Sequence, residues 1–291
     1  MLHVSLLGGQ AITDDRGGSI QARSSRVVVL IAFLVMHAGS AQARQRIAGL
    51  LWPESTSAQS LTNLRRELHH LRQILGDEPS LVVTPRDLCW HDTKTCRVDV
   101  RVFDGEHTAA LAAAAAGDDD GMLRHASAAI AAYRGELLPG VYDDWLLDAR
   151  AQLERQCVDL YDLACAAWAR AGDLARAVEA ATRALDLADP ESELAGQAHF
   201  IAGCSAFSLG MPADGLRHFE LGAQLASGAV WLSFGTRPDV HGKAFAGHAH
   251  WLLGHQDEAL AACREAITLA GRSTTRTARR WPSPTAASPT R

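Results

Sequence analysis

The sequence predicts a mainly α-helical protein in which a small amino-terminal α+β unit is followed by an α-helical solenoid. Two observations carry this prediction. Short β-prone segments are confined to the amino-terminal third, and beyond it apolar residues recur at helical spacing and glycines recur between helical segments. A chain of 291 residues with 47 % hydrophobic content is long enough for about two domains with packed cores.

The amino-terminal third has the predicted order sheet, three helices, hairpin. The segments LHVSLLGG and AITDDRGGSI predict a small antiparallel sheet, and Ser24 or Ser25 can cap the first helix. The three predicted helices span residues 26–37, 43–52 and 57–76. The segment LVVTPRDLCW has two β-prone halves around a turn, which predicts a hairpin with Arg86 near its tip. This order is that of a winged helix.

The helix predicted at residues 57–76 has one apolar and one polar face. Its apolar stripe consists of Leu61, Leu64, Leu68, Leu71 and Leu75. At about 100° per residue, the opposite face carries Gln59, Thr62, Asn63, Arg66, His70 and Gln73, with Arg65 and Arg72 on one flank and Glu67 on the other. Arginine neutralises phosphates or reads guanine, and amides can pair with adenine, so this face suits a DNA major groove. The alternative is an ordinary solvated helix surface.

These residues give a candidate DNA interface. We expect Arg66 to read bases, with Asn63 one turn earlier, and Arg65 and Arg72 to contact phosphates. The full candidate set is Gln59, Thr62, Asn63, Arg65, Arg66, His70, Arg72 and Arg86.

Charge is divided along the chain. Residues 1–98 hold 11 Lys and Arg against 8 Asp and Glu, which gives +3, and residues 99–271 hold 12 against 25, which gives −13. A basic amino-terminal third joined to an acidic middle is typical of a DNA reader with a protein-facing module. Chance variation is the alternative, because +3 is small.

Glycines punctuate the helical remainder of the chain. Segments beginning near Gly172, Gly210 and Gly254 can be laid over one another, and each has a small residue five positions after its glycine: Ala177, Gly215 and Ala259. The periods of 38 and 44 residues suit tetratricopeptide-like units with long helices or loops. Such units stack into solenoids, which bind proteins far more often than they catalyse reactions.

Several strings carry a family resemblance. RIAGLLWPES, NLRRELHHLRQILGD and LVVTPRDLCW resemble the OmpR-type winged helix of SARP-like bacterial transcriptional activators. VDVRVFDGEHTAAL and YRGELLPGVYDDWLLDARAQL are similar to the family's next module, the tetratricopeptide-like bacterial transcriptional activator domain. The resemblance covers residues 1–190 and implies that 57–76 is the recognition helix, 43–52 the supporting helix and the hairpin the wing. It also implies promoter DNA with direct-repeat sites and recruitment of RNA polymerase. One departure is Gln42-Ala43, where the family pattern has a Ser or Thr cap.

Nothing in the sequence predicts catalysis, a cofactor or a metal site. No phosphate-binding Gly-x-x-x-x-Gly-Lys-Ser/Thr loop is present, so the chain resembles a shortened form of relatives that carry an ATPase module. The spacing of His248 and His250 does not suit a helical metal site, and the six cysteines lack zinc-finger spacing. The longest apolar run is too short to cross a bilayer, so we expect a cytoplasmic protein.

The predicted domains are 1–98 (winged helix), 99–190 (activator domain), 191–271 (further repeats) and 272–291 (a disordered tail rich in Ser, Thr, Pro and Arg). The leading functional prediction is a sequence-specific DNA-binding regulator whose repeats dimerise and contact transcription machinery. The alternatives are a protein-interaction adaptor with weak or no specific DNA binding, and a remnant of an ATP-dependent regulator without independent activity.

Overall fold

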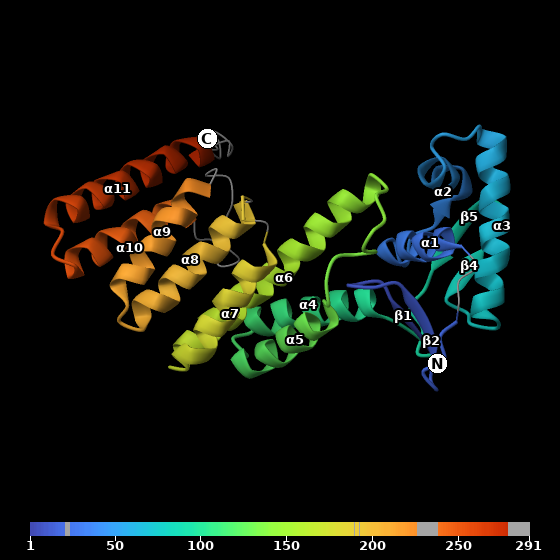
Figure 1. The fold of residues 1–291 in the computed structure, drawn as a ribbon, viewed down its shortest axis with the longest axis horizontal. Helices are drawn as coiled ribbons and strands as arrows, with labels where there is room; N and C mark the ends of the chain where they lie inside the picture. The colour runs from blue at the N-terminus through green and yellow to red at the C-terminus, as the bar shows by residue number, and fades with distance from the viewer. Residues whose placement is uncertain (21–23, 189, 192, 226–237, 279–291) are drawn as a thin grey trace, which may run out of the picture. The chain divides into compact units, whose positions relative to one another are not determined.

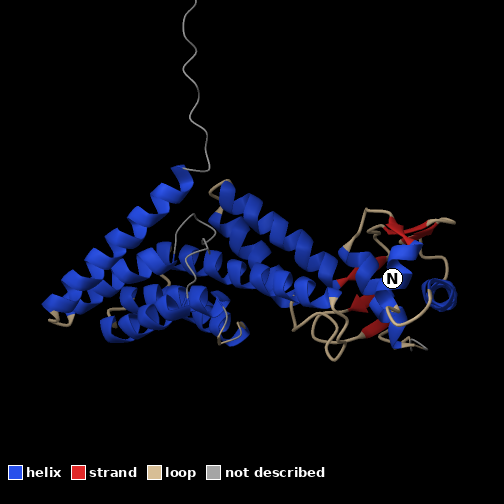
Figure 2. Cartoon of the chain, turned by 90° about the horizontal axis from the view of Figure 1, so that it is seen from above, coloured by secondary structure: helices blue, strands red, loops and turns tan. Residues whose placement is uncertain are grey.

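The structure is a computed structural model that describes residues 1–20, 24–188, 190–191, 193–225 and 238–278. The chain forms two compact units, Met1–Leu160 and Tyr161–Arg291, and each is described by itself. Within the described residues, every strand lies in the first unit, and the second unit is helical (Figure 2). The predicted fold class, an amino-terminal α+β unit followed by a helical array, is confirmed.

The first unit holds two three-stranded sheets (Figure 1). The first sheet has the order β2-β1-β6 and consists of β1 (Leu2–Ser5), β2 (Ala11–Asp14) and β6 (Cys96–Val98). Strand β1 pairs antiparallel with β2, as predicted, and parallel with β6, which was not predicted. The second sheet has the order β3-β5-β4 and consists of β3 (Gln42–Ala43), β4 (Leu81–Val83) and β5 (Asp87–Trp90). Strands β4 and β5 form the predicted hairpin.

Three helices lie between β2 and β4 in the sequence, and β3 lies between the first and the second of them. They are α1 (Ser25–Met36), α2 (Arg44–Leu51) and α3 (Ser57–Leu75). The Ser24 side chain caps α1 by accepting a hydrogen bond from the Arg26 N–H, and residues 27–35 are all buried, which confirms α1 as the central core helix. Helix α2 begins after Ala43 without a side-chain cap, in line with the departure seen in the sequence. The order of elements is that of a winged helix.

The remaining helices form pairs joined by glycines. They are α4 (Asp99–Ala115), α5 (Asp119–Ala132), α6 (Trp145–Arg170), α7 (Leu174–Leu187), α8 (Glu193–Ser208), α9 (Pro212–Leu225), α10 (Pro238–Leu252) and α11 (Gln256–Ala278). The predicted repeat glycines Gly172, Gly210 and Gly254 lie between the paired helices with φ of +78°, +77° and +85°. Gly117 has φ of +74° between α4 and α5, so that pair closes with the same turn.

Small residues let the helices of the second unit approach closely. The carbonyl oxygen of Gly196 in α8 lies 2.9 Å from where a Cβ on Gly222 of α9 would stand. The ring of Phe219 lies against Gly203 in the same way and is buried with Phe200 and Ala246. Gly215, one of the small residues that follow a repeat glycine, also lies at this crossing, where a Cβ would stand 3.2 Å from the Gly203 carbonyl oxygen.

The segment that follows α5 is joined by backbone contacts to the end of β1. Leu7 and Leu137 form an antiparallel bridge, and the Gly8 N–H donates to the Glu136 carbonyl over 3.0 Å. Gly135 has φ of +149°, and a Cβ there would stand 3.0 Å from the Cα of Gly8. The glycine in the string YRGELLPG is therefore required by this close backbone contact.

The compact units divide the chain between Leu160 and Tyr161, and the domain limits at residues 98 and 190 stay predictions. Helices α4 and α5 belong to the unit that contains the sheets, because the Asp99 carboxylate accepts hydrogen bonds from the backbone N–H groups of Leu6 and Leu7. Helix α11 extends to Ala278, so the segment predicted to be disordered begins with helical residues. Residues 279–291 lie outside the described part of the chain. None of the described helices has the length and apolar character needed to span a bilayer.

Candidate nucleic-acid interface

Helix α3 presents the predicted apolar face to the core. Leu64, Leu68, Leu71 and Leu75 are buried, and Leu61 is half-buried near the amino-terminal end. The Thr56 side chain caps the helix, and Gly76 follows its last residue with φ of +58°. Two capped ends and a buried stripe hold this helix in a fixed orientation, so its polar face is presented to solvent in a defined way.

Most of the predicted DNA-binding side chains are exposed. The exposed ones on α3 are Gln59, Thr62, Arg65, Arg66 and Arg72, and Asn63 is half-buried. The Gln59 amide donates to the Asn63 side-chain oxygen over 3.1 Å, which leaves the Asn63 amide hydrogens directed to other partners. Arg66 is 62 % exposed at the middle of the face.

Glu67 departs from the prediction. It was placed on the exposed flank, but its side chain is 1 % exposed. Helix α3 packs against both α1 and α2, so its buried arc is wider than the leucine stripe and includes Ser60 and Glu67. One Glu67 oxygen accepts a hydrogen bond from Nε of Arg66 over 3.2 Å, and the other lies 3.6 Å from Nδ1 of His70.

This buried carboxylate changes what the two neighbouring candidates can do. Arg66 is held at Nε, and no described residue hydrogen-bonds to its two terminal nitrogens, which can therefore donate as a fork. His70 is only 21 % exposed, and its Nδ1 is buried facing Glu67. Arg66 therefore remains a candidate for base reading, whereas His70 can offer only the outer edge of its ring.

The hairpin that was predicted to be the wing has a tight turn, which is hydrogen-bonded to the start of α2. The hydroxyl of Thr84 accepts hydrogen bonds from the backbone N–H groups of Arg86 and Asp87, over 3.3 and 2.8 Å. The Arg86 carbonyl accepts from the Arg44 N–H over 2.9 Å, next to the β3–β5 pairing at Ala43. The exposed Arg86 side chain is therefore carried at a fixed position beside α2.

A groove of about 470 Å³ lies between the start of α2, helix α3 and this turn. Its lining consists of Ala43, Arg44, Gln45, Leu61, Arg65, Pro85, Arg86 and Asp87. The structure thus brings the predicted Arg65 and Arg86 together and adds Arg44, which sequence analysis missed. A cation in the first turn of a helix opposes the helix dipole, and this unfavourable placement is the signal that could have identified Arg44.

The string YRGELLPGVYDDW follows α5 within the first unit and packs against α1. Both carboxylate oxygens of Asp143 bind the guanidinium of Arg26 in α1, at 2.7 and 2.5 Å. The Trp145 indole meets the Phe33 ring edge-on at 5.4 Å, while Tyr142 is 89 % exposed. The string therefore has a structural role at Gly135, Asp143 and Trp145.

Residues 98–228 match the family model of the bacterial transcriptional activator domain. The matched region begins at the last residue of β6 and includes helices α4 to α9. It therefore starts where the sheet ends, and its first helix carries the Asp99 carboxylate that binds the end of β1.

Three solved structures are similar to the chain to different extents. Mycobacterium tuberculosis EmbR, in complex with a low affinity phosphopeptide, is similar over 95 % of this chain and 71 % of that chain, with a TM-score of 0.70 and 21 % identity. BtubC from P. vanneervenii covers 91 % of this chain and 94 % of its own, with a TM-score of 0.47 and 14 % identity. YrrB, a TPR protein with an unusual peptide-binding site, covers 82 % and 91 %, with a TM-score of 0.40 and 14 % identity. No curated protein sequence matches the chain.

Two pairs of histidines lie in the second unit. His199 and His218 face each other with 2.9 Å between their Nδ1 atoms, and burial lowers the pKa of both from the ordinary value of 6.5. The rings of His250 and His255 lie 5.8 Å apart. Within the described residues, no group of three or more His, Cys, Asp or Glu is placed to hold a metal ion.

Proposed function

We propose that the chain is a sequence-specific DNA-binding transcriptional regulator, most simply an activator. The observation that carries this proposal is the groove in which Arg44, Arg65 and Arg86 lie beside the polar face of α3, in a unit with the element order of a winged helix. The presence of an activator domain directly after β6 supports a role in transcription.

In this proposal, α3 lies in the major groove of promoter DNA. Arg66 reads a guanine through its two terminal nitrogens, and Asn63 and Gln59 contact neighbouring bases. The three groove arginines hold the phosphate backbone, since a guanidinium binds phosphate oxygens in pairs and a hairpin turn can follow the strand beside the recognition helix. Thr62, Arg72 and the outer edge of His70 complete the contacts along the helix.

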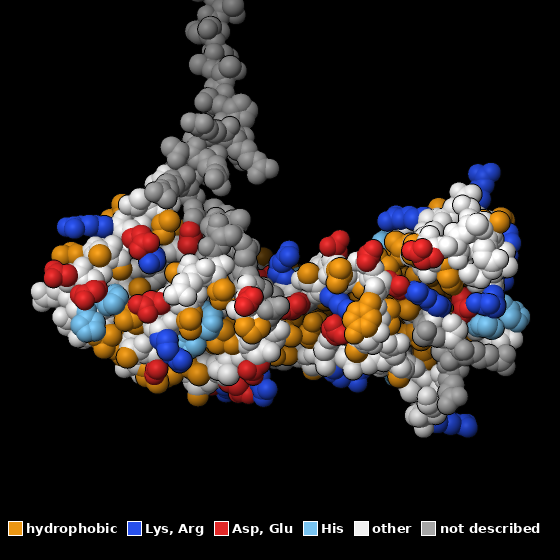
Figure 3. All heavy atoms as spheres, turned by 45° about the horizontal axis from the view of Figure 1, so that its top comes forward, with side chains coloured by type: hydrophobic (Ala, Val, Ile, Leu, Met, Phe, Trp, Pro, Cys, Tyr) orange, Lys and Arg blue, Asp and Glu red, His pale blue; other side chains and the backbone are white. Residues whose placement is uncertain are grey.

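The second part of the proposal concerns the role of the helical repeats. Residues 99–271 have a net charge of −13, and Figure 3 shows acidic side chains scattered over the surface of these helices, so they are poorly suited to bind DNA. We propose that they pair two copies of the chain on repeated half-sites and contact RNA polymerase, in the bacterial cytoplasm. Pairing raises affinity because the second half-site is bound at high effective concentration.

A protein-interaction adaptor is the second candidate. It is supported by large apolar side chains exposed on the last described helices, where Trp251 is 62 % and Ile267 is 73 % exposed. In this alternative the winged helix contributes little specific DNA binding.

Matched arginine variants separate base reading from phosphate contact. Arg66→Ala should cost about 1–3 kcal/mol on the selected site and relax its sequence preference. Arg65→Gln or Arg86→Gln should weaken selected and random duplexes alike and lower the salt dependence by about one ion. Arg124→Gln, on the exposed surface of α5, is the control and should change neither the affinity for DNA nor its salt dependence. Equal losses for all three interface variants on both kinds of DNA would contradict the assignment of Arg66.

A further inference from the structure

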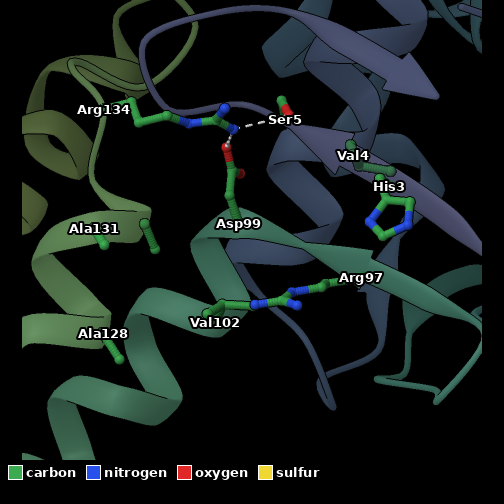
Figure 4. Close-up of a pocket in the computed structure, with 10 residues that line it drawn as sticks. His3, Val4, Ser5, Arg97, Asp99, Val102, Ala128, Ala131 and Arg134 are labelled. Carbon is green, nitrogen blue, oxygen red and sulfur yellow. Dashed lines mark hydrogen bonds and ion pairs between the residues drawn. The ribbon is translucent and has the colours of Figure 1, made fainter. Parts of the chain in front are cut away.

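A second cavity, of about 300 Å³, lies in the first unit and shares no lining residue with the DNA-facing groove. Its walls come from β1, β6, the start of α4 and the end of α5 (Figure 4). The lining side chains are His3, Val4, Ser5, Arg97, Asp99, Val102, Ala128, Ala131, Ala132 and Arg134. The volume is at the lower end of the range for pockets that hold small molecules.

One side of the cavity is cationic. Arg134 donates to the Ser5 hydroxyl over 3.1 Å and lies 3.6 Å from Asp99. Arg97 extends from β6 into the space below Asp99 and is the second cation (Figure 4). Within the described residues no carboxylate pairs with Arg97, which is exposed to solvent on the cavity side.

Asp99 does not cancel this charge in full. Its side chain is only 9 % exposed, and its oxygens already accept hydrogen bonds from the backbone N–H groups of Leu6, Leu7 and Val100. The lining therefore carries two arginines against one carboxylate, a net charge of +1.

The wall that α4 and α5 contribute to the cavity is apolar. Val102 of α4 and three alanines near the end of α5, Ala128, Ala131 and Ala132, line it (Figure 4). Alanine side chains leave room that larger apolar residues would fill, and they offer no hydrogen bond. A ligand that fits both sides has an oxyanion at one end and a short apolar group at the other.

We propose that this cavity binds a small organic anion, a carboxylate or phosphate that carries a short apolar group. Arg97 and Arg134 hold the oxygen atoms, and the α4 and α5 side chains contact the apolar group. Because the walls belong both to the sheet of the winged helix and to the activator domain, a bound anion stabilises the contact between them. The site is independent of the DNA-binding proposal, since its occupation is measured without DNA.

The full chain is titrated with phenyl phosphate, with benzoate and with inorganic phosphate, and sodium chloride at equal ionic strength is the reference. Calorimetry and thermal melting should show saturable binding and a raised Tm for phenyl phosphate, benzoate or both, because a ligand that binds only the folded state stabilises it. Whichever of the two binds identifies the anionic group. Inorganic phosphate should bind more weakly, because it lacks the apolar group.

Three variants test the site. Arg97→Gln should weaken the binding of the active probe about tenfold or more, since a charge-assisted contact is lost. Ala131→Leu should weaken it without changing any charge, by filling the apolar side. Arg124→Gln, which keeps the cavity intact, should bind as the wild type does. The proposal is overturned if no probe exceeds the salt reference, or if Arg97→Gln binds unchanged. The proposed contact with an apolar group is overturned if Ala131→Leu binds the probe as the wild type does and inorganic phosphate binds as tightly as phenyl phosphate.

Discussion

Replacing Gly8 with alanine tests how firmly the segment after α5 is joined to the end of β1. Gly8 has φ of +71°, and a Cβ there would stand 2.4 Å from the Arg134 carbonyl oxygen, a backbone atom. Gly17, in the turn after β2, has nearly the same φ, +74°, but a Cβ there would meet nothing within 4 Å. Both substitutions therefore place an alanine in the left-handed region of φ, but only Gly8→Ala also creates a steric clash with another backbone atom.

The magnitudes follow from these two situations. An L-residue in the left-handed region costs about 1–2 kcal/mol, and both variants lose this amount. Forcing extra atoms into a packed contact costs about 1–3 kcal/mol more, and only Gly8→Ala incurs it. We expect Gly8→Ala to lower the free energy of unfolding by about 2–5 kcal/mol and Gly17→Ala by about 1–2 kcal/mol.

Urea unfolding measures the difference in free energy, and hydrogen exchange locates it. The Leu138 N–H donates to the Leu6 carbonyl over 2.8 Å at the same contact. Gly8→Ala should speed the exchange of this amide far more than Gly17→Ala does, because the carbonyl of Arg134 must move away. Equal losses of stability, with equal protection of Leu138, would refute the reasoning.

Three further predictions concern the second unit and the DNA. Gly203→Ala should destabilise the repeats by about 1–3 kcal/mol in thermal melting, because its Cβ would stand 2.6 Å from the Phe219 ring, whereas at Gly242 the nearest atoms are 3.8 Å away and alanine should cost less. Burial lowers the pKa of His199 and His218, so folding favours their neutral forms. The Tm should therefore fall as the pH drops below 6.5. Replacing both histidines with glutamine should reduce that fall in Tm. Inserting about five base pairs between half-sites should weaken full-chain binding in titrations, because the partners would then lie on opposite faces of the DNA.

Local patterns in the sequence were sufficient for much of the fold. The leucine spacing predicted α3, and the residues around Ser24 and Gly76 predicted helix ends that the structure confirms. Repeat glycines were predictable because a tight turn between antiparallel helices requires a positive φ. These features depend on residues that are close in sequence.

Features that depend on distant residues could not be predicted. Glu67 is buried because two other helices pack on α3. The periodicity of apolar residues in α3 does not show how many helices pack against it. Arg44 joins Arg65 and Arg86 only through the pairing of β3 with β5. The contact of Gly135 with Gly8 joins segments far apart in the chain, so the string that carries the family resemblance gave no indication of its partner.

The affinity of the full chain for a selected duplex, compared with a random duplex of equal length at the same salt concentration, tests the central claim most directly. The duplex is first enriched from a random library by the wild-type chain. A sequence-specific regulator should bind the selected duplex about 10³-fold or more tightly than the random one at physiological salt. A ratio near one at every salt concentration would contradict sequence-specific DNA binding and favour the adaptor.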